Sequence, residues 1–138
     1  MRISASVTNR PGQHRVVLRT GDAEHTLDVA PKASGAGSAT NGGEFLMLAL
    51  ATCYCNDLYR EAARLGVALD RVEVWAEAEF EGIGLAARDV RYHARVQSPA
   101  SPDAIARLLR ETDAVAEVHN TLRQGVPVQW IATTPDTP

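Results

Sequence analysis

Short segments rich in β-branched residues alternate with turn signals over the first thirty residues. The turn signals are an Asn-Arg-Pro-Gly run at positions 9–12 and a Gly-Asp pair at positions 21–22. In the middle segment, Val16 and Leu18 are set against Arg15 and Arg19, which gives one face for a core and one for water. The pattern predicts a β-meander with strands at Arg2–Val7, His14–Arg19 and His25–Val29.

A long helix is predicted from Glu44 to Gly66. Glu44 suits the positive end of the helix dipole, and Gly66 is a typical C-terminal stop. Its first half, Phe45 to Cys53, is apolar on every side and should therefore be buried on every side. The second half is amphipathic, with its polar positions at Asn56, Asp57, Arg60, Glu61 and Arg64.

The C-terminal half predicts a hairpin and helices. Arg71 to Phe80 alternates apolar and polar residues, and Asp89 to Val96 is its expected hairpin partner. Ser101 and Pro102 form an N-cap signal for a helix. A short helical piece over Val115–Arg123, a last strand over Val126–Ile131 and a frayed tail over residues 133–138 complete the pattern. Strands, a long helix, a hairpin and helices in this order predict an α+β fold.

Composition places the chain among ordinary globular proteins. It has 138 residues, 45% of them hydrophobic and 22% charged, with a formal net charge of −3. We expect a single domain over residues 1–138. With no basic block and no apolar run of about 18 residues, we expect no nucleic-acid partner, no membrane span and a cytoplasmic location. The Gly-rich loop from Pro31 to Gly43 has neither G-x-G-x-x-G nor a GK[ST] ending, so no nucleotide is expected there.

Cys53 and Cys55 carry the most promising chemistry. A cysteine on an apolar helix is most often a small core residue. However, Cys53 lies where the helix turns polar, and Asp57 follows four residues later on the same face. Cys55 projects about 200° away, so a disulfide between the two would require local unwinding. We expect Cys53 to be the reactive thiol. The four histidines are scattered, and only His119 would pair with Cys53 around a metal, so no metal site and no cofactor are expected.

Three segments resemble the OsmC/Ohr family of osmotically inducible and organic hydroperoxide resistance proteins. The first is SGAGSATNGGEFLMLALATC at residues 34–53, which is similar to the family's Gly-rich loop, T-N-P-E-E-L motif and Ala-rich helix ending in Cys. The second is the strand pair that follows. The third is HNTLRQGVPV at residues 119–128, which is similar to the family's C-P-V-S-N-T-L-R followed by a short strand.

The resemblance implies an intertwined homodimer with two active sites at the subunit interface. In the family, a thiolate on the central helix reduces organic hydroperoxides, a second Cys closes a disulfide, and external dithiols reduce it. An Arg from the N-terminal turn and a Glu at the helix start hold the thiolate and the peroxide. Carried over by position, the thiolate is Cys53 and the Arg is Arg10, with Arg15 as the second choice.

The sequence departs from the family pattern at three positions. Ala116 stands where the family has its second Cys, His119 stands where it often has Ser, and Glu44 is one residue from the family Glu. One hypothesis is a one-cysteine peroxidase for organic hydroperoxides, with an external thiol reductant and Glu44 or Asp57 orienting the Arg. The retained Cys, the Gly-rich loop and Asn120 favour it. The alternative is a non-enzymatic protein in which the same apolar interface pocket binds a small hydrophobic ligand and Cys53 is only a packing residue or a sensor. The missing second Cys and the displaced Glu favour it. The candidate binding residues are Asp57, His119 and Asn120.

Overall fold

The computed structural model describes residues 1–132, and its contacts divide the chain into two compact units, Met1–Leu46 and Met47–Pro138. The predicted tail at residues 133–138 lies outside the described residues, and the single domain stays a prediction. The order of elements is three strands, a long helix, a two-stranded hairpin and two further helices. The predicted α+β class is confirmed. No helix in the described part of the chain combines the length and apolarity that a membrane crossing needs.

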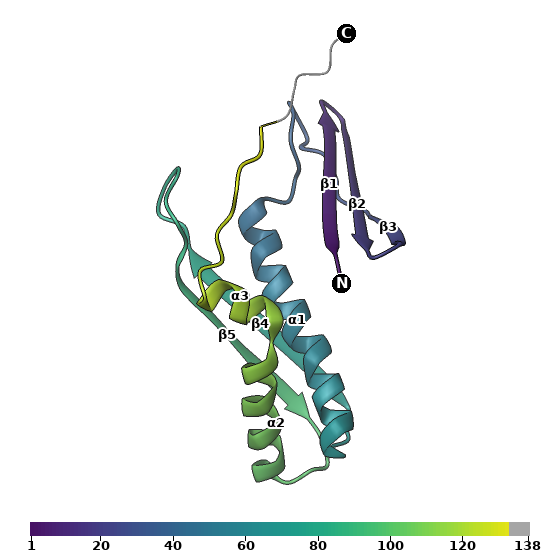
Figure 1. Ribbon diagram of the computed structural model, residues 1–138, viewed down its shortest axis with the longest axis vertical. Helices are drawn as coiled ribbons and strands as arrows, with labels where there is room; N and C mark the ends of the chain where they lie inside the picture. The colour runs from purple at the N-terminus through teal and green to yellow at the C-terminus, as the bar shows by residue number, and fades with distance from the viewer. Residues whose placement is uncertain (133–138) are drawn as a thin grey trace. The chain divides into compact units, whose positions relative to one another are not determined.

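The first unit contains the predicted meander (Figure 1). Strands β1 (Ile3–Arg10), β2 (Gln13–Thr20) and β3 (Ala23–Leu27) form an antiparallel sheet in the order β1-β2-β3. Asn9 pairs with His14 and Arg10 with Gln13, so the first turn is shorter than the predicted four residues. Pro11 and Gly12 alone make it. Gly12 has a φ of +77°, which a Pro-Gly turn accommodates because glycine lacks a Cβ.

Strand β2 differs from the expectation of one buried face and one wet face. Arg15 and Arg19 are exposed and Val16 is buried, as predicted. Val17 is buried as well, at 7% exposure. Successive side chains of a strand point to opposite faces, so both faces of this middle strand are covered at residues 16 and 17.

Helix α1 (Gly42–Leu65) begins and ends within two residues of the prediction. Its start is a capping box, in which the Asn41 side chain accepts from the Glu44 N–H at 2.8 Å and the Glu44 carboxylate accepts from the Asn41 N–H at 2.8 Å. Gly66, with a φ of +67°, follows its last turn.

The burial of α1 differs from the expectation in both halves of the helix. In the apolar first half, Leu48 is 54% exposed. The buried apolar residues form one stripe with a four-residue spacing, which is the face that packs in the chain: Leu50, Tyr54, Leu58 and Ala62. In the amphipathic second half, Leu58 and Ala62 are buried as predicted, but two positions predicted to be polar are buried as well, Asp57 and Glu61. They are buried because arginines neutralise them, Arg60 beside Asp57 and Arg64 beside Glu61.

The core of the second unit lies between helices and the hairpin. Strand β4 (Arg71–Glu79) pairs antiparallel with β5 (Arg88–Gln97), and helix α2 (Pro102–Val115) runs beside α1 (Figure 1). The predicted cap of α2 is confirmed, because the Ser101 hydroxyl accepts from the Ala104 N–H at 3.2 Å. Buried side chains of both helices pack against half-buried residues of the hairpin, including Val72, Val74, Tyr92, Ala94 and Val96.

One of the two remaining C-terminal predictions is confirmed and the other is wrong. The short helix predicted over Val115–Arg123 is α3 (Glu117–Arg123), which begins two residues later because Val115 ends α2 and Ala116 has an extended backbone (φ −73°, ψ 105°). The predicted last strand is wrong, because residues 126–131 form no strand in the described part of the chain. This segment has exposed apolar side chains, including Val128, which is 99% exposed, and Trp130, which is 88% exposed. A strand needs a neighbour for its backbone N–H and C=O groups, and alternation in the sequence does not supply one.

Candidate functional site

Cys53 lies half-buried on α1 and faces two carboxylates. Its Sγ donates to Asp57 Oδ2 at 3.6 Å and lies 4.0 Å from Glu117 Oε2. Asp57 is one helical turn further on, so the predicted shared face of these two residues is confirmed. Glu117 arrives from the other side, at the start of α3.

Glu117 reaches Cys53 because the chain breaks between α2 and α3 at Ala116. Ala116 is fully buried, and Glu117 is the first residue of the new helix. Arg60, one turn beyond Asp57 and two turns beyond Cys53, then joins the two acids. Its Nη1 lies 2.8 Å from Asp57 Oδ1 and 3.6 Å from Glu117 Oε1. We call Cys53, Asp57, Arg60 and Glu117 the thiol cluster.

The charges of the thiol cluster favour the protonated thiol. Burial raises the pKa of Cys53, and the negative charges of Asp57 and Glu117 raise it further, while a hydrogen bond from the backbone N–H of Val118 partly opposes them. Burial and Glu117 also raise the pKa of Asp57, against the opposing charge of Arg60. A reactive thiolate needs a neighbouring positive charge. Here the Arg60 guanidinium binds the two carboxylates, and the carboxylates rather than the guanidinium contact the Cys53 sulfur. The thiolate therefore has no positive charge beside it within the thiol cluster.

Three ligand atoms of the thiol cluster could meet around a metal ion. One from each of Cys53, Asp57 and Glu117 lies within 4.8 Å of the others. Arg60 already binds both acids, and a cation would have to displace it. His119, the partner that the sequence suggested for a metal on Cys53, is not a member of this group.

The other residues predicted for the catalytic site lie in the first unit or have structural partners. The Arg10 Nε donates to Gln13 Oε1 across the turn of the meander. Arg15 is exposed on β2, and Glu44 caps α1. In the second unit, Asn120 donates to the Ala114 carbonyl at 3.1 Å and so ties α3 to the end of α2. The catalytic roles of Arg10 and Glu44 and the binding role of Asn120 stay predictions.

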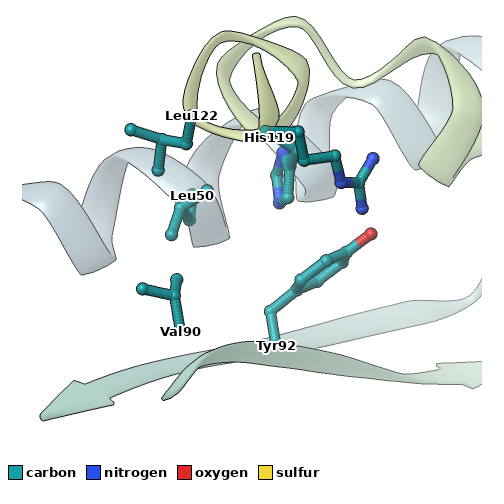
Figure 2. Close-up of a pocket in the computed structure, with 6 residues that line it drawn as sticks. Leu50, Val90, Tyr92, His119 and Leu122 are labelled. Atoms are coloured by element: carbon teal, nitrogen blue, oxygen red, sulfur yellow. The ribbon is translucent and has the colours of Figure 1, made fainter. Parts of the chain in front are cut away.

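A second feature of this unit is a cavity of about 240 Å³ between α1, β5 and α3. Six residues line it, and we call it the His119 pocket: Leu50, Val90, Tyr92, His119, Leu122 and Arg123. Figure 2 shows the His119 ring extending from α3 toward Tyr92, while Leu50 and Val90 face each other across the cavity. The wall is therefore mostly apolar, and the His119 imidazole and the Arg123 guanidinium are its polar groups.

His119 is the unusual residue of this pocket. It is only 3% exposed, and among the described residues neither ring nitrogen has a hydrogen-bond partner. Its ring lies 4.3 Å from the Tyr92 ring and 5.8 Å from the Tyr54 ring, centroid to centroid. Burial and the charge of Arg123 lower the pKa of His119, against an opposing contribution from Asp113. The imidazole is therefore neutral at pH 7.

The charged and hydroxyl groups near His119 are already paired. The Arg123 Nη2 lies 2.6 Å from Asp113 Oδ1, and the Tyr92 hydroxyl donates to the same oxygen. The Arg123 Nη1 also donates to the Asp113 carbonyl and to Asn120 Oδ1, each at 3.2 Å. The hydrogen bond from the Tyr92 hydroxyl, as the largest cause, and the hydrogen bond and charge of Arg123 lower the pKa of Asp113. The guanidinium and the carboxylate neutralise each other, and His119 remains the open polar group.

Sequence reasoning missed Glu117 and the pocket residues Leu50, Val90 and Tyr92. The sequence did contain a signal for Glu117. Its neighbour Ala116 stands where the OsmC/Ohr family has its second cysteine, which forms a disulfide with the thiol on the central helix. Residues around Ala116 should therefore lie near Cys53. Nothing comparable marks Val90 or Tyr92, which resemble any other residues of an alternating strand.

Comparisons with known proteins agree with the fold of this chain. Residues 35–131 match the family model described as OsmC-like protein. The fold is similar to that of the OsmC-like protein from Mycoplasma pneumoniae, with 21% identity and a TM-score of 0.62 over 91% of this chain and 87% of that one. An OsmC-like hydroperoxide resistance protein from Jannaschia is 14% identical, with a TM-score of 0.58 over 98% and 96% of the two chains.

A third similar structure contains an organic molecule. It is a putative organic hydroperoxide resistance protein from Vibrio cholerae with captopril bound in one of its active sites. It is 21% identical, with a TM-score of 0.55 over 89% of this chain and 85% of that one. No curated protein matches the sequence. Since the family model covers well over half of its residues, this chain belongs to the OsmC-like family, which includes organic hydroperoxide resistance proteins.

Proposed function

We propose that this protein binds small, largely apolar organic molecules in the His119 pocket. The observation that carries the proposal is a buried imidazole with two unpartnered nitrogens at the end of an apolar cavity. A buried polar group without a partner costs roughly 1–3 kcal/mol, so a native structure that keeps one gains when a ligand supplies the missing bond.

The dimensions of the pocket suit a compact ligand. An engineered apolar cavity of about 150 Å³ binds benzene, and this pocket measures about 240 Å³. It can hold a substituted benzene ring or a branched chain of similar size. The captopril bound to the Vibrio cholerae relative supports the idea that this fold accommodates small organic molecules.

A probe molecule and a pocket-filling variant test the proposal. Phenol at millimolar concentration should raise the melting temperature of the protein, because a ligand that binds only the folded state stabilises it. Leu122→Trp should abolish this rise by filling the pocket, since Leu122 lines it and is 42% exposed. Leu85→Trp is the matched control on the hairpin turn, where the leucine is 59% exposed. A rise that persists in Leu122→Trp, or no rise in any of the three proteins, would contradict the proposal.

The second candidate is a one-cysteine peroxidase for organic hydroperoxides. Cys53 at the family's thiol position and the Val118 N–H that bonds its sulfur favour this function. The thiolate would attack the distal peroxide oxygen, breaking the O–O bond and giving Cys53 sulfenic acid and an alcohol once the alkoxide takes a proton. A small external thiol would then form a mixed disulfide and release water, and a second thiol would restore Cys53.

Dimedone trapping tests the second candidate. After about one equivalent of cumene hydroperoxide, a dimedone adduct on Cys53 would support the peroxidase. A Cys53–Cys55 disulfide is not expected, because the two side chains point about 200° apart on the helix. An unmodified Cys53 would exclude the peroxidase and leave ligand binding.

We also propose that two copies of the chain form a homodimer. Exposed apolar residues on the first half of α1, such as Leu48, and along residues 126–131 support it, because large apolar side chains gain free energy when an interface removes them from water. Light scattering should give twice 14.8 kDa at micromolar concentration. Val128→Asp should shift the mass toward the monomer, while Leu85→Asp should not. A monomeric mass for the unmodified protein would contradict the dimer.

A further inference from the structure

We propose that the His119 pocket selects neutral molecules with a hydroxyl-type group, one that donates and accepts a hydrogen bond at the same atom. This inference rests on the proposed ligand-binding function and specifies the ligand class.

The neutral imidazole sets the hydrogen-bonding requirement. Its ring carries one N–H donor and one bare nitrogen acceptor. Neither is bonded to a described residue of the chain. A hydroxyl group complements either nitrogen, because it can accept from the N–H in one tautomer and donate to the bare nitrogen in the other. A purely apolar molecule of the same shape would fill the cavity and leave both nitrogens unpaired.

The charges near the pocket favour a neutral ligand. An anion would be drawn to Arg123, but that guanidinium already binds Asp113 at 2.6 Å and Asn120 at 3.2 Å. A cation would meet the same guanidinium and the apolar wall formed by Leu50, Val90 and Leu122. In either case, the ion would lose its hydration without gaining a free counter-charge.

The His119 pocket and the thiol cluster lie on different sides of α3. On one side of α3, the Glu117 carboxylate contacts the Cys53 sulfur. On the other side, His119 lines the pocket together with Tyr92 and Val90 of β5. Two residues two positions apart on a helix project about 200° from each other, which explains the separation. The hydroxyl-selective site therefore depends on His119, and none of the residues that line it is a cysteine.

Four probes with one ring and different substituents test the ligand class. Phenol carries a hydroxyl, toluene only a methyl, benzoate a negative charge and benzylamine, protonated at pH 7.5, a positive charge. Titrations followed by NMR should show phenol binding about tenfold more tightly than toluene, in line with one hydrogen bond to a buried group. Benzoate and benzylamine should bind more weakly than phenol.

His119→Leu should remove the preference without closing the pocket. We expect its phenol affinity to fall about tenfold, to the level of toluene, while its toluene affinity stays within about threefold of the original. His93→Leu is the matched control, because His93 stacks on Trp75 at the exposed face of the hairpin. His119→Gln should keep part of the phenol preference, since its amide both donates and accepts.

The outcomes separate the two proposals. If none of the four probes binds, the ligand-binding function fails. If toluene binds as tightly as phenol, or benzoate binds best, the pocket stands but the hydroxyl preference is overturned. If His119→Leu does not fold, the ¹⁵N shifts of the His119 ring in the unmodified protein decide. Phenol should move them as a new hydrogen bond does, and unmoved shifts would contradict the proposal.

Discussion

The thiol cluster and the His119 pocket both contain residues of α1 and α3, and each contains a buried polar side chain. The two regions differ in whether that side chain has a hydrogen-bond partner. In the thiol cluster, Asp57 is buried and bonded to both Arg60 and Cys53. In the pocket, His119 is equally buried and has no hydrogen-bond partner among the described residues. A buried polar group that is internally satisfied contributes to the fold. A buried polar group left open costs free energy until something else binds it.

The residues of the two proposed functions also differ. The residue type at the thiol position is retained, but its surroundings are acidic and disfavour the thiolate. The position where the family often has Ser carries His119 here, and it faces an apolar cavity. The proposed ligand binding therefore depends on His119, and the proposed peroxidase chemistry depends on Cys53.

The largest difference between the two regions should appear when their polar groups are removed. Arg60→Met should lower the free energy of unfolding by about 1–3 kcal/mol, because it leaves the Asp57 carboxylate, 7% exposed, without its cation. Arg60 is itself half-exposed, which holds the effect below that of a fully buried pair. Urea unfolding measures the change.

Arg88→Met is the control for this loss. Arg88 pairs with Glu81 on the hairpin, and both side chains are about half-exposed. Exposed pairs contribute about 0–1 kcal/mol. Equal losses in the two variants would mean that the thiol cluster is no better satisfied than an ordinary surface pair.

The reactivity of Cys53 should come next in size. In a Cys55→Ser background, Asp57→Asn should speed iodoacetamide labelling of Cys53 at pH 7.5 by about fivefold. The physical reason is that a negative charge near the sulfur raises the pKa of the thiol, and such a charge at about 4 Å in water is equivalent to ~1 kcal/mol. The labelling rate of the parent should still be rising at pH 9. Slower labelling in Asp57→Asn would show that Asp57 activates the thiol.

Removing His119 should change stability far less than removing Arg60. His119→Leu should leave the free energy of unfolding within about 1 kcal/mol, because it deletes two unsatisfied polar atoms along with part of the packing. Leu58→Ala is the reference for a large loss, because Leu58 is fully buried on α1. Its free energy of unfolding should fall by about 2–5 kcal/mol. A loss of that size in His119→Leu would indicate that the imidazole already has a partner in the native protein.

The smallest expected effect is a pH dependence of stability. Because the pKa of His119 is lowered in the folded state, the unfolded chain binds more protons once the pH falls below about 6.5. The contribution of this residue to stability is therefore lost as the pH drops below that value. Arg123 and Asp113 face the same ring and keep their charges across this range.

Unfolding at pH 7.5 and 5.5 measures this dependence. His119→Leu should gain stability relative to the parent at the lower pH, and His93→Leu should not. A parent that gains more than His119→Leu on acidification would mean that Asp113 outweighs the burial of the ring.

Local patterns in the sequence determined most of the secondary structure. The meander, the long helix, the hairpin and the Ser101 cap follow from alternation, capping residues and glycine stops, which act over a few neighbouring residues. The helical spacing of Cys53 and Asp57 likewise predicted their contact. The resemblance to the family located Cys53 and the replacement of its partner by Ala116.

Only the tertiary structure decided what those residues face. The break at Ala116 brings Glu117 against the thiol and turns His119 into the cavity, and no period in the sequence marks that break. From the sequence, Asp57 and Glu61 are predicted to lie on a solvent-exposed helix face. In the structure both are buried, and each is paired with an arginine, Arg60 or Arg64. The predicted last strand at 126–131 shows the same limit, since pairing needs a neighbour that alternation alone cannot specify. A side chain's chemistry depends on charges and partners brought from distant parts of the chain, and packing alone determines which these are.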